Sequence, residues 1–365
     1  MPKQDISIGT KKIGYGRPVF IIAEAGVNHN GKLSLAKKLI DVAAKAGADA
    51  VKFQTFDPDT LVTKDAAKAE YQVRNEENPS RLRRRVLPLG KGESQYEMLK
   101  RLMLPRTYHS ELKRYAEKKG LIFLSTPFSL SDAQFLRTLG VPAFKVASSD
   151  TNNLPFLSRI ATWKLPIILS TGMADMAEVK EAVRAIKKAG NTKLVLLQCT
   201  TNYPTAFTET NLRAIQTLHK AFGLPVGFSD HTIGNEAAVA AVALGAVVVE
   251  KHFTLDRDLP GPDHKASLAP SELLDFVTKV RNTEAALGTG KKVPFTSEKE
   301  TAKVARKSIV GTDDIKRGDR FTKRNLGIKR PGTGLLPKDY DGIIGKRATR
   351  DIEADTLLTK YDYKA

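Results

Sequence analysis

The sequence alternates short apolar runs with amphipathic helical stretches from residue 19 to residue 287. The apolar runs predict strands at Val19–Glu24, Ala50–Gln54, Leu121–Ser125, Ala143–Val146, Pro166–Leu169, Leu194–Gln198, Val226–Phe228 and Val247–His252. The helical stretches include Leu33–Ala46, Ser131–Leu139, Met173–Ala189, Asn235–Leu244 and Ser271–Leu287. Eight strand–helix units in about 285 residues predict a (β/α)8 TIM barrel. A doubly wound open sheet is the rival, but it usually has a glycine-rich turn after its first strand, and residues 24–31 (EAGVNHNG) are not one.

The composition is that of a folded, water-soluble protein, with 41% hydrophobic and 27% charged residues. The single cysteine, Cys199, excludes an intrachain disulfide framework and suits a reducing compartment. The polar N-terminal residues do not resemble a secretory signal, and the longest apolar run, 237–249, is broken by Gly245 and is too short to span a bilayer. These features predict a cytoplasmic protein without a membrane span.

The formal net charge of +19 keeps a nucleic-acid or other anion-binding protein open as a different class. Arg81–Arg85 is a short basic run that predicts either a solvated loop or an anion contact. It lies in a long polar segment, 57–93, which on a barrel predicts a functional lid or an interface arm. The charge indicates anionic partners but does not identify them.

The alternation of strands and helices predicted from the sequence ends after residue 287. Residues 1–287 are predicted to form the barrel, and residues 288–301 are predicted to be a linker. Residues 302–365 are predicted to form a small, separate, β-rich domain, because short β-like runs there alternate with turns rich in Gly, Asp and Lys.

Polar side chains stand at the carboxyl ends of the predicted strands, where barrel enzymes assemble their active sites. They are Glu24, Lys52, Gln54, Ser125, Thr126, Lys145, Ser148, Asp150, Ser170, Thr171, Thr200, Ser229, Asp230, His231, Lys251 and His252. Lysines and hydroxyls at several strand ends form a suitable binding site for a phosphorylated or carboxylated substrate, because both donate hydrogen bonds to oxyanions. Any one of them alone is equally well explained as a strand-end hydrogen bond to a loop.

His231 and His252 lie one strand–helix period apart, so they end adjacent strands and could face one divalent metal. The alternative is that each histidine is satisfied by hydrogen bonds in the core or in a loop. His29, after the first strand, is a second candidate, and Cys199 is expected to be a small buried residue rather than a nucleophile.

The strand-end motifs, taken in order, resemble the sialic acid synthase family. They are EAGVNHNG at 24–31, VKFQT at 51–55, STPF at 125–128, FKVASSD at 144–150, LSTGM at 169–173, QCTTNYP at 198–204, FSDHT at 228–232, EKHFT at 250–254 and GPDHKAS at 261–267. The tail, with ARKSIV at 305–310, DIKRG at 314–318 and KRPGTG at 329–334, resembles that family's C-terminal antifreeze-like (SAF) domain. Any one motif is weak evidence for the family, but the whole set in this order is specific to it.

The resemblance implies an enzyme that condenses phosphoenolpyruvate with N-acetylmannosamine and water to give N-acetylneuraminate and phosphate. It implies a divalent metal, Mn²⁺ or Mg²⁺, held by His231 and His252. It also implies Glu24, Asp150, Lys52 and Lys145 as catalytic residues. The remaining substrate contacts that it implies are Gln54, Thr126, Ser148, Ser170, Tyr203, Ser229 and Asp263.

The resemblance further implies that Arg330 reaches from the antifreeze-like domain of one chain into the barrel of a partner, which predicts a domain-swapped homodimer. N-acetylmannosamine is the favoured sugar. The alternatives are an N,N'-diacetyllegionaminate synthase that uses 2,4-diacetamido-2,4,6-trideoxymannose and an N-acylneuraminate-9-phosphate synthase. Thr201 stands where bacterial sialic acid synthases often carry Asn, so the sugar's substituents stay open. An anion-binding protein without catalysis is the alternative of another class, although nucleic acid is not the expected partner.

Overall fold

A computed structural model describes residues 5–76 and 93–364 of the chain. The chain divides into two compact units, Met1–Gly288 and Thr289–Ala365, and each is described by itself. The Arg81–Arg85 run lies outside the described residues.

Eight parallel strands form the centre of the first unit, in the order β5-β4-β3-β10-β9-β8-β7-β6. Their bounds are β3 Phe20–Gly26, β4 Ala50–Thr55, β5 Ile122–Pro127, β6 Phe144–Val146, β7 Ile167–Ser170, β8 Leu194–Cys199, β9 Val226–Asp230 and β10 Val248–His252. The two end strands, β5 and β6, contact each other, so the sheet is a nearly closed barrel. This cyclic order follows the chain order, which excludes the doubly wound sheet and confirms the predicted (β/α)8 fold.

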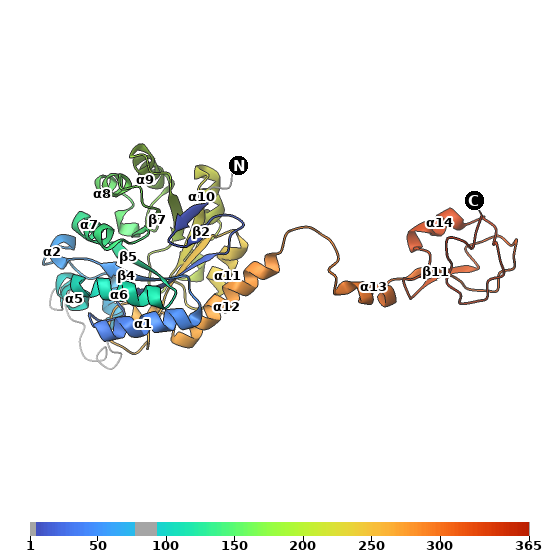
Figure 1. Ribbon diagram of the computed structural model, residues 1–365, viewed down its shortest axis with the longest axis horizontal. Coiled ribbons are helices and arrows are strands. Elements are labelled where there is room, and N and C mark those ends of the chain that lie inside the picture. Colours follow the sequence, from blue (N-terminus) through green and yellow to red (C-terminus); the bar gives the residue numbers. More distant parts are fainter. Residues whose placement is uncertain (1–4, 77–92, 365) are drawn as a thin grey trace. The chain divides into compact units, whose positions relative to one another are not determined.

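Helices surround the strands (Figure 1). They are α1 Leu33–Ala46, α6 Arg106–Lys118, α7 Leu130–Leu139, α8 Leu154–Ala161, α9 Met176–Lys188, α10 Ala214–Phe222, α11 Glu236–Ala243 and α12 Pro270–Leu287. α9 begins at Met176 rather than at Met173 as predicted, because the Asp175 side chain accepts hydrogen bonds from the amides of Ala177 and Glu178 and so caps the helix.

Strand residues alternate between two environments, because successive side chains point to opposite sides of a strand. One set, which includes Ile21, Val51 and Phe228, packs outward against the helices. The other set, which includes Ile22 and Leu197, packs inside the barrel. The inward positions become polar toward the carboxyl ends of the strands, and this change places the functional side chains.

An N-terminal hairpin, β1 (Ile6–Ile8) and β2 (Lys11–Ile13), was not predicted. Its three isoleucines, Ile6, Ile8 and Ile13, belong to the same apolar cluster as the inward residues of the barrel. Three-residue strands are too short for a sequence pattern, and their burial depends on the barrel that they cover.

In the described part of the segment predicted to be a lid or an interface arm, the chain forms α2 (Pro58–Leu61) and α3 (Glu70–Glu76), and α5 (Gln95–Leu102) follows the segment. The side chains of Arg74 and Asn75 donate hydrogen bonds to backbone carbonyl oxygens of the barrel loops, Arg74 to Tyr203 at 3.0 Å and Asn75 to Pro262 at 2.8 Å. These contacts hold α3 beside the loops that follow β8 and β10.

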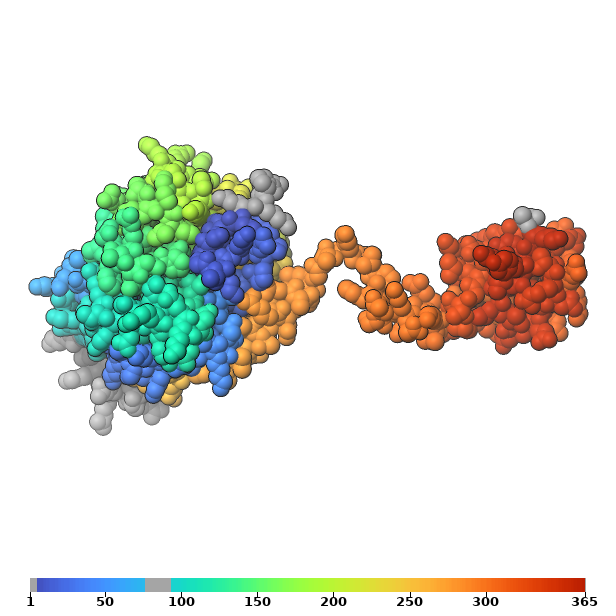
Figure 2. Space-filling view, viewed as in Figure 1, coloured from blue at the N-terminus to red at the C-terminus, as the bar shows by residue number. Residues whose placement is uncertain are grey.

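The second unit is small and has its own core. It contains α13 (Glu298–Ala305), the antiparallel strands β11 (Ser308–Gly311) and β12 (Leu326–Lys329), and α14 (Tyr340–Ile343). Its core consists of Ile309, Ile315, Phe321, Leu326, Ile343, Ala348, Ile352 and Leu358. In Figure 2 the red atoms, which are those of the later residues of this unit, are gathered in one body. α13 begins inside the segment 288–301, which was predicted to be a linker. None of the helices described is both long and apolar enough to cross a membrane.

Three buried histidines support the barrel from outside its interior. The rings of His29, His109 and His264 are at most 1% exposed. Burial lowers the pKa of His29 to about 3 and the pKa values of His109 and His264 to about 4 each. Their hydrogen bonds suit neutral rings, since His29 Nδ1 accepts from the Gly31 amide at 3.0 Å and His109 Nε2 lies 2.9 Å from the Thr55 hydroxyl.

The barrel should therefore lose stability as the pH falls below about 6.5, where these histidines become protonated in the unfolded chain but not in the folded one. Stability is fully present above that pH and is lost progressively toward pH 4. The expected loss between pH 6.5 and pH 5 is about 2 kcal/mol per histidine. Urea unfolding followed by fluorescence of the single tryptophan, Trp163, at both pH values measures it.

His29→Asn is the matched variant, because the Asn side-chain oxygen can still accept from the Gly31 amide but does not titrate. It should remove about a third of the pH dependence. A pH dependence equal to that of the parent protein would contradict the assignment for His29.

Candidate active site

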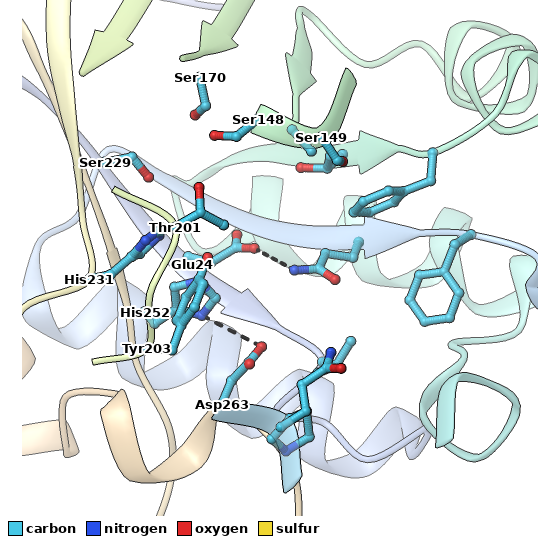
Figure 3. A pocket seen from close by; sticks show the side chains of 18 of the residues that line it. Glu24, Ser148, Ser149, Ser170, Thr201, Tyr203, Ser229, His231, His252 and Asp263 are labelled. Carbon is cyan, nitrogen blue, oxygen red and sulfur yellow. Dashed lines mark hydrogen bonds and ion pairs between the residues drawn. The ribbon is translucent and has the colours of Figure 1, made fainter. Parts of the chain in front are cut away.

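A cavity of about 410 Å³ lies at the carboxyl ends of the strands. Its lining includes every site residue that the family resemblance implied except Asp150 and Arg330 (Figure 3). These are Glu24, Lys52, Gln54, Thr126, Lys145, Ser148, Ser170, Tyr203, Ser229, His231, His252 and Asp263. Five of the other strand-end candidates, Ser125, Thr171, Thr200, Asp230 and Lys251, do not line it. The barrel thus brings together side chains that are far apart in the sequence.

Two lysines and two glutamates alternate at the deep end of the cavity. Lys52 Nζ lies 2.8 Å from a Glu24 carboxylate oxygen and 3.6 Å from Glu250 Oε1. Lys145 Nζ lies 3.5 Å from the same Glu250 oxygen. All four side chains are at most 5% exposed. Buried charges need partners of opposite sign, and here each lysine has one.

This arrangement shifts the pKa of each group. Burial raises the pKa of Glu24 to about 7, against the opposing effect of the Lys52 ammonium and with a further increase from Glu250. Burial also lowers the pKa of Lys145, whereas for Lys52 the two carboxylates outweigh burial and raise it. Glu24 is therefore a group that can give or take a proton near neutral pH.

Hydroxyl groups accompany the charged residues. Lys52 Nζ donates to Thr126 Oγ1 at 3.1 Å, and Lys145 Nζ donates to Ser170 Oγ at 2.7 Å. Ser148 Oγ accepts from the Gly172 amide at 3.0 Å, so its own proton can be donated into the cavity. Two ammonium groups with several hydroxyls can bind a small anion that carries both a carboxylate and a phosphate.

His231 and His252 lie next to each other at one side of the cavity, with ring centroids 5.6 Å apart. Figure 3 shows both imidazoles beside the ring of Tyr203, which stacks on His231 at a centroid distance of 4.0 Å. His231 Nδ1 lies 2.7 Å from the Thr200 carbonyl oxygen. Because a carbonyl only accepts, Nδ1 carries the proton and Nε2 keeps its lone pair for another partner.

His252 has a buried nitrogen without a hydrogen-bond partner. Among the described residues, nothing hydrogen-bonds its Nδ1, and the nearest carboxylate oxygen, on Asp263, is 4.0 Å away. Burial, followed by repulsion between a protonated His252 and the groups of His231, Lys52, Lys145 and Lys251, holds the pKa of His252 well below its usual range. Against the opposing effect of burial, the Cys199 thiol and the Thr200 carbonyl oxygen raise the pKa of His231. In their neutral forms the two imidazoles each keep a lone pair, which fits a divalent metal that takes its other ligands from water and substrate. Within the described ranges, no group of three or more His, Cys, Asp or Glu side chains is placed to hold a metal.

The outer part of the cavity is apolar. Val27, Phe56, Leu61, Met98, Leu99, Leu102 and Phe128 line it, and they pack together as one cluster. Tyr71 of α3 completes this side and lies 5.0 Å from Tyr203, measured between ring centroids. The cavity therefore has a charged deep end, a pair of histidines and an apolar outer wall.

Asp150 and Arg330 are the two residues implied by the family resemblance that do not line this cavity. Asp150 ends a 3₁₀ turn (Ser148–Asp150), where its carboxylate accepts from the Asn153 side chain at 2.9 Å. Burial raises the pKa of Asp150. Arg330 lies in the second unit, exposed, directly after β12.

Glu250 and the apolar wall were missed in the sequence. Glu250 could have been found, because it stands two residues before His252 on a strand and so faces the same side. The apolar wall could not have been found in this way, since its residues come from four separate segments. Apolar residues near Phe56 and Met98 are explained equally well as part of an ordinary hydrophobic core.

Comparisons with known proteins agree with this geometry. The NeuB family model matches residues 39–292, and the SAF domain model matches residues 306–364. The N,N'-diacetyllegionaminic acid synthase of Campylobacter jejuni is 46% identical over 344 residues, which cover 94% of this chain and 99% of that protein. The chain belongs to the NeuB family.

Two further relatives match most of the chain. The N,N'-diacetyllegionaminic acid synthase of Legionella pneumophila is 45% identical over 354 residues, covering 96% of each protein. A crystal structure of the N-acetylneuraminic acid (sialic acid) synthetase of Leptospira borgpetersenii, in complex with citrate, is 37% identical with a TM-score of 0.69 and covers 82% of this chain and 95% of that one. The NeuB-family barrel and the SAF domain predicted from the motifs are thus both confirmed.

The buried lysines give a direct test of anion binding in this NeuB-family protein. Lys145→Met should weaken binding of phosphoenolpyruvate by about 3 kcal/mol, roughly a hundredfold in Kd, because it removes a buried cation and leaves Glu250 with one fewer partner. Isothermal titration calorimetry measures the Kd. Lys11→Met is the control, since Lys11 pairs with Asp49 away from the cavity with half of its side chain exposed. A Kd for Lys145→Met close to that of the control would contradict this role.

Proposed function

We propose that the protein condenses phosphoenolpyruvate with 2,4-diacetamido-2,4,6-trideoxymannose and water, giving N,N'-diacetyllegionaminate and phosphate. Membership of the NeuB family makes it an enzyme, a synthase of sialic-acid-like sugars that forms a carbon–carbon bond. The observation that carries the proposal is a single cavity with two buried lysines at its deep end, two histidines at its side and an apolar outer wall.

Phosphoenolpyruvate fits the deep end. Its carboxylate and phosphate are anions that cannot be desolvated without partners, and Lys52 and Lys145 with the hydroxyls of Thr126 and Ser170 supply them. Glu24 and Glu250 keep both lysines paired when the anion is absent. The substrate therefore exchanges one set of charge partners for another.

The sugar lies between the deep end and the apolar wall in this proposal. A divalent metal, Mn²⁺ or Mg²⁺, held by His231 and His252 would polarise the aldehyde oxygen of the sugar and make its carbon electrophilic. Asp263 and Gln54 line the cavity beside these histidines and can bind hydroxyl or amide groups of the sugar. Tyr203 fixes the ring of His231 by stacking on it.

The reaction needs balanced bond changes and one well-placed proton donor. C3 of phosphoenolpyruvate bonds to the aldehyde carbon, water adds to C2, and the C2–O bond to the phosphoryl group breaks and releases phosphate. The oxygen of the attacking water becomes the 2-keto oxygen. Of the two protons that this water loses, one goes to the aldehyde oxygen and the other to the departing phosphate. Glu24, buried and with a pKa of about 7, is the described carboxyl suited to moving a proton here.

Two observations favour the diacetamido sugar over N-acetylmannosamine, the sugar favoured from the sequence. The Campylobacter and Legionella relatives, both named N,N'-diacetyllegionaminic acid synthase, match nearly the whole chain. The outer wall is apolar, which suits a 6-methyl group and an acetamido methyl better than hydroxyls. Among the described lining residues the only lysines are Lys52 and Lys145, and no arginine is present, so the barrel of one chain supplies no cation of its own at the outer wall for a 6-phosphate.

Phosphate release tests the reaction and the sugar together. With phosphoenolpyruvate and Mn²⁺, we expect release with the diacetamido trideoxy sugar and a kcat/KM at least about tenfold lower with N-acetylmannosamine, because two apolar contacts are lost. EDTA should abolish release. N-acetylmannosamine 6-phosphate should be the poorest acceptor of the three.

Leu99→Asn tests the origin of this preference, because Leu99 lines the outer wall and is only partly buried. It should narrow the gap between the two unphosphorylated sugars, while Lys100→Asn, on the exposed side of the same helix, should not. Equal use of both sugars by the parent would reject the diacetamido assignment. No release with any amino sugar would reject the proposed reaction.

We also propose a domain-swapped homodimer in which Arg330 of each chain enters the barrel of its partner. The loops after β7, β8 and β9 expose Met173, Phe207 and Ile233, with exposed fractions of 70%, 54% and 59%. Exposed apolar groups around an active-site mouth support burial by another protein surface.

Complementation between two variants tests the shared site. Arg330→Ala and Lys145→Met should each be inactive, but co-expression of the two should restore about a quarter of parental activity, because half of the dimers are mixed and each mixed dimer has one intact site. If Arg330 serves its own barrel, every site carries a defect and no activity returns. That result would rule out the swap.

A further inference from the structure

A buried ion pair lies directly behind the two histidines. Lys251 and Asp230 are partners across the parallel strands β10 and β9. Lys251 Nζ is 2.7 Å from Asp230 Oδ2, and their side chains are 1% and 0% exposed. Each residue immediately precedes one of the histidines in the sequence, so each points away from the cavity on the outer side of its strand.

The pair is fully hydrogen-bonded. Besides Asp230, Lys251 Nζ donates to the Thr232 carbonyl oxygen at 2.6 Å and lies 3.4 Å from the Thr232 hydroxyl. The other oxygen of Asp230 accepts from the amide and the hydroxyl of Thr232, at 2.8 and 2.7 Å. We refer to these three residues as the Asp230–Thr232–Lys251 clamp.

The clamp holds the chain on both sides of His231. Asp230 precedes His231 and Thr232 follows it, and Lys251 binds both of these residues from the strand that carries His252. Any shift of His231 relative to His252 therefore has to stretch bonds to a buried ammonium group. Charged groups buried in this way are costly compared with apolar residues of the same size, so stability alone does not explain them.

We propose that the Asp230–Thr232–Lys251 clamp is a positioning unit that fixes the separation and direction of the His231 and His252 imidazoles, and thereby sets the metal affinity of the site. None of the three clamp residues lines the cavity, so in this proposal the clamp acts through the two histidines. The inference rests on the proposed metal role of the two histidines. It assigns a function to a charged pair that the reaction itself does not use.

Metal binding by the full-length chain tests this directly. Metal-stripped protein is titrated with Mn²⁺, and free Mn²⁺ is followed by its electron paramagnetic resonance signal. Lys251→Met and Asp230→Asn should each raise the Kd for Mn²⁺ at least about tenfold, as loss of partners outside the ligand shell does in other metal sites. Binding of phosphoenolpyruvate without metal, measured by calorimetry, should change less than about twofold, because Lys52 and Lys145 lie on other strands.

Arg281→Met is the matched control for lost stability. Arg281 pairs with the buried carboxylate of Asp49 at 2.7 Å, away from the cavity. This variant should lower the melting temperature without changing the Kd for Mn²⁺. If Lys251→Met does not fold, Thr232→Val keeps the ion pair, removes only the hydroxyl, and should raise the Kd in the same direction by a smaller factor.

The outcomes separate this inference from the proposed function. A parent protein that binds Mn²⁺ with an affinity that all folded clamp variants retain overturns the clamp alone. A parent protein that binds no Mn²⁺ overturns the metal role of the histidines and the clamp's purpose with it. Equal losses of Mn²⁺ and phosphoenolpyruvate affinity would show general disruption of the barrel end and also count against the clamp.

Discussion

Two lysine ammonium groups are buried at the carboxyl end of the barrel, and their charge is sustained by two carboxylates buried with them. Lys52, between Glu24 and Glu250, and Lys145, beside Glu250, form an alternating row with separations of 2.8 to 3.6 Å. Such a row requires strands that direct four side chains, from β3, β4, β6 and β10, into one interior. The parallel barrel meets this requirement, because residues at equivalent positions of neighbouring strands face the same interior. The apolar layer beneath, which includes Ile22 and Leu197, shields the row from water on that side.

The sequence predicted the parts of this arrangement that depend on local pattern. All eight barrel strands are present, with ends within two residues of those predicted, because apolar runs between polar turns are a local signal. Most of the site followed from them, since a polar residue at a strand end in a barrel faces a common mouth. The N-terminal hairpin and the apolar wall were not predictable, because their burial depends on neighbours distant in the chain. Asp150 shows the opposite case, in which a motif position was clear but its side chain is held by Asn153.

The histidines show how one side chain acquires different properties from its surroundings. His231 and His252 are buried at the cavity, each with a nitrogen available for a further partner. His29, His109 and His264 are equally buried but lie outside the barrel interior, where hydrogen bonds and burial keep their rings neutral. Sequence spacing distinguishes the first pair only because both follow strands. The buried neutral rings stabilise the fold at neutral pH and have no assigned part in the reaction.

The cavity separates the groups proposed to bind phosphoenolpyruvate from those proposed to contact the sugar. The charged row and its hydroxyls are built from strands of the barrel, whose positions the whole fold determines. The apolar wall is built from the segments around α2 and α5 together with loop residues such as Val27 and Phe128, which the barrel does not require for closure. Substitutions in the wall can therefore alter which sugar fits without disturbing the groups that bind phosphoenolpyruvate. This division gives a physical reason why proteins similar to this chain are named for different acids, N,N'-diacetyllegionaminic acid in Campylobacter jejuni and N-acetylneuraminic acid in Leptospira borgpetersenii.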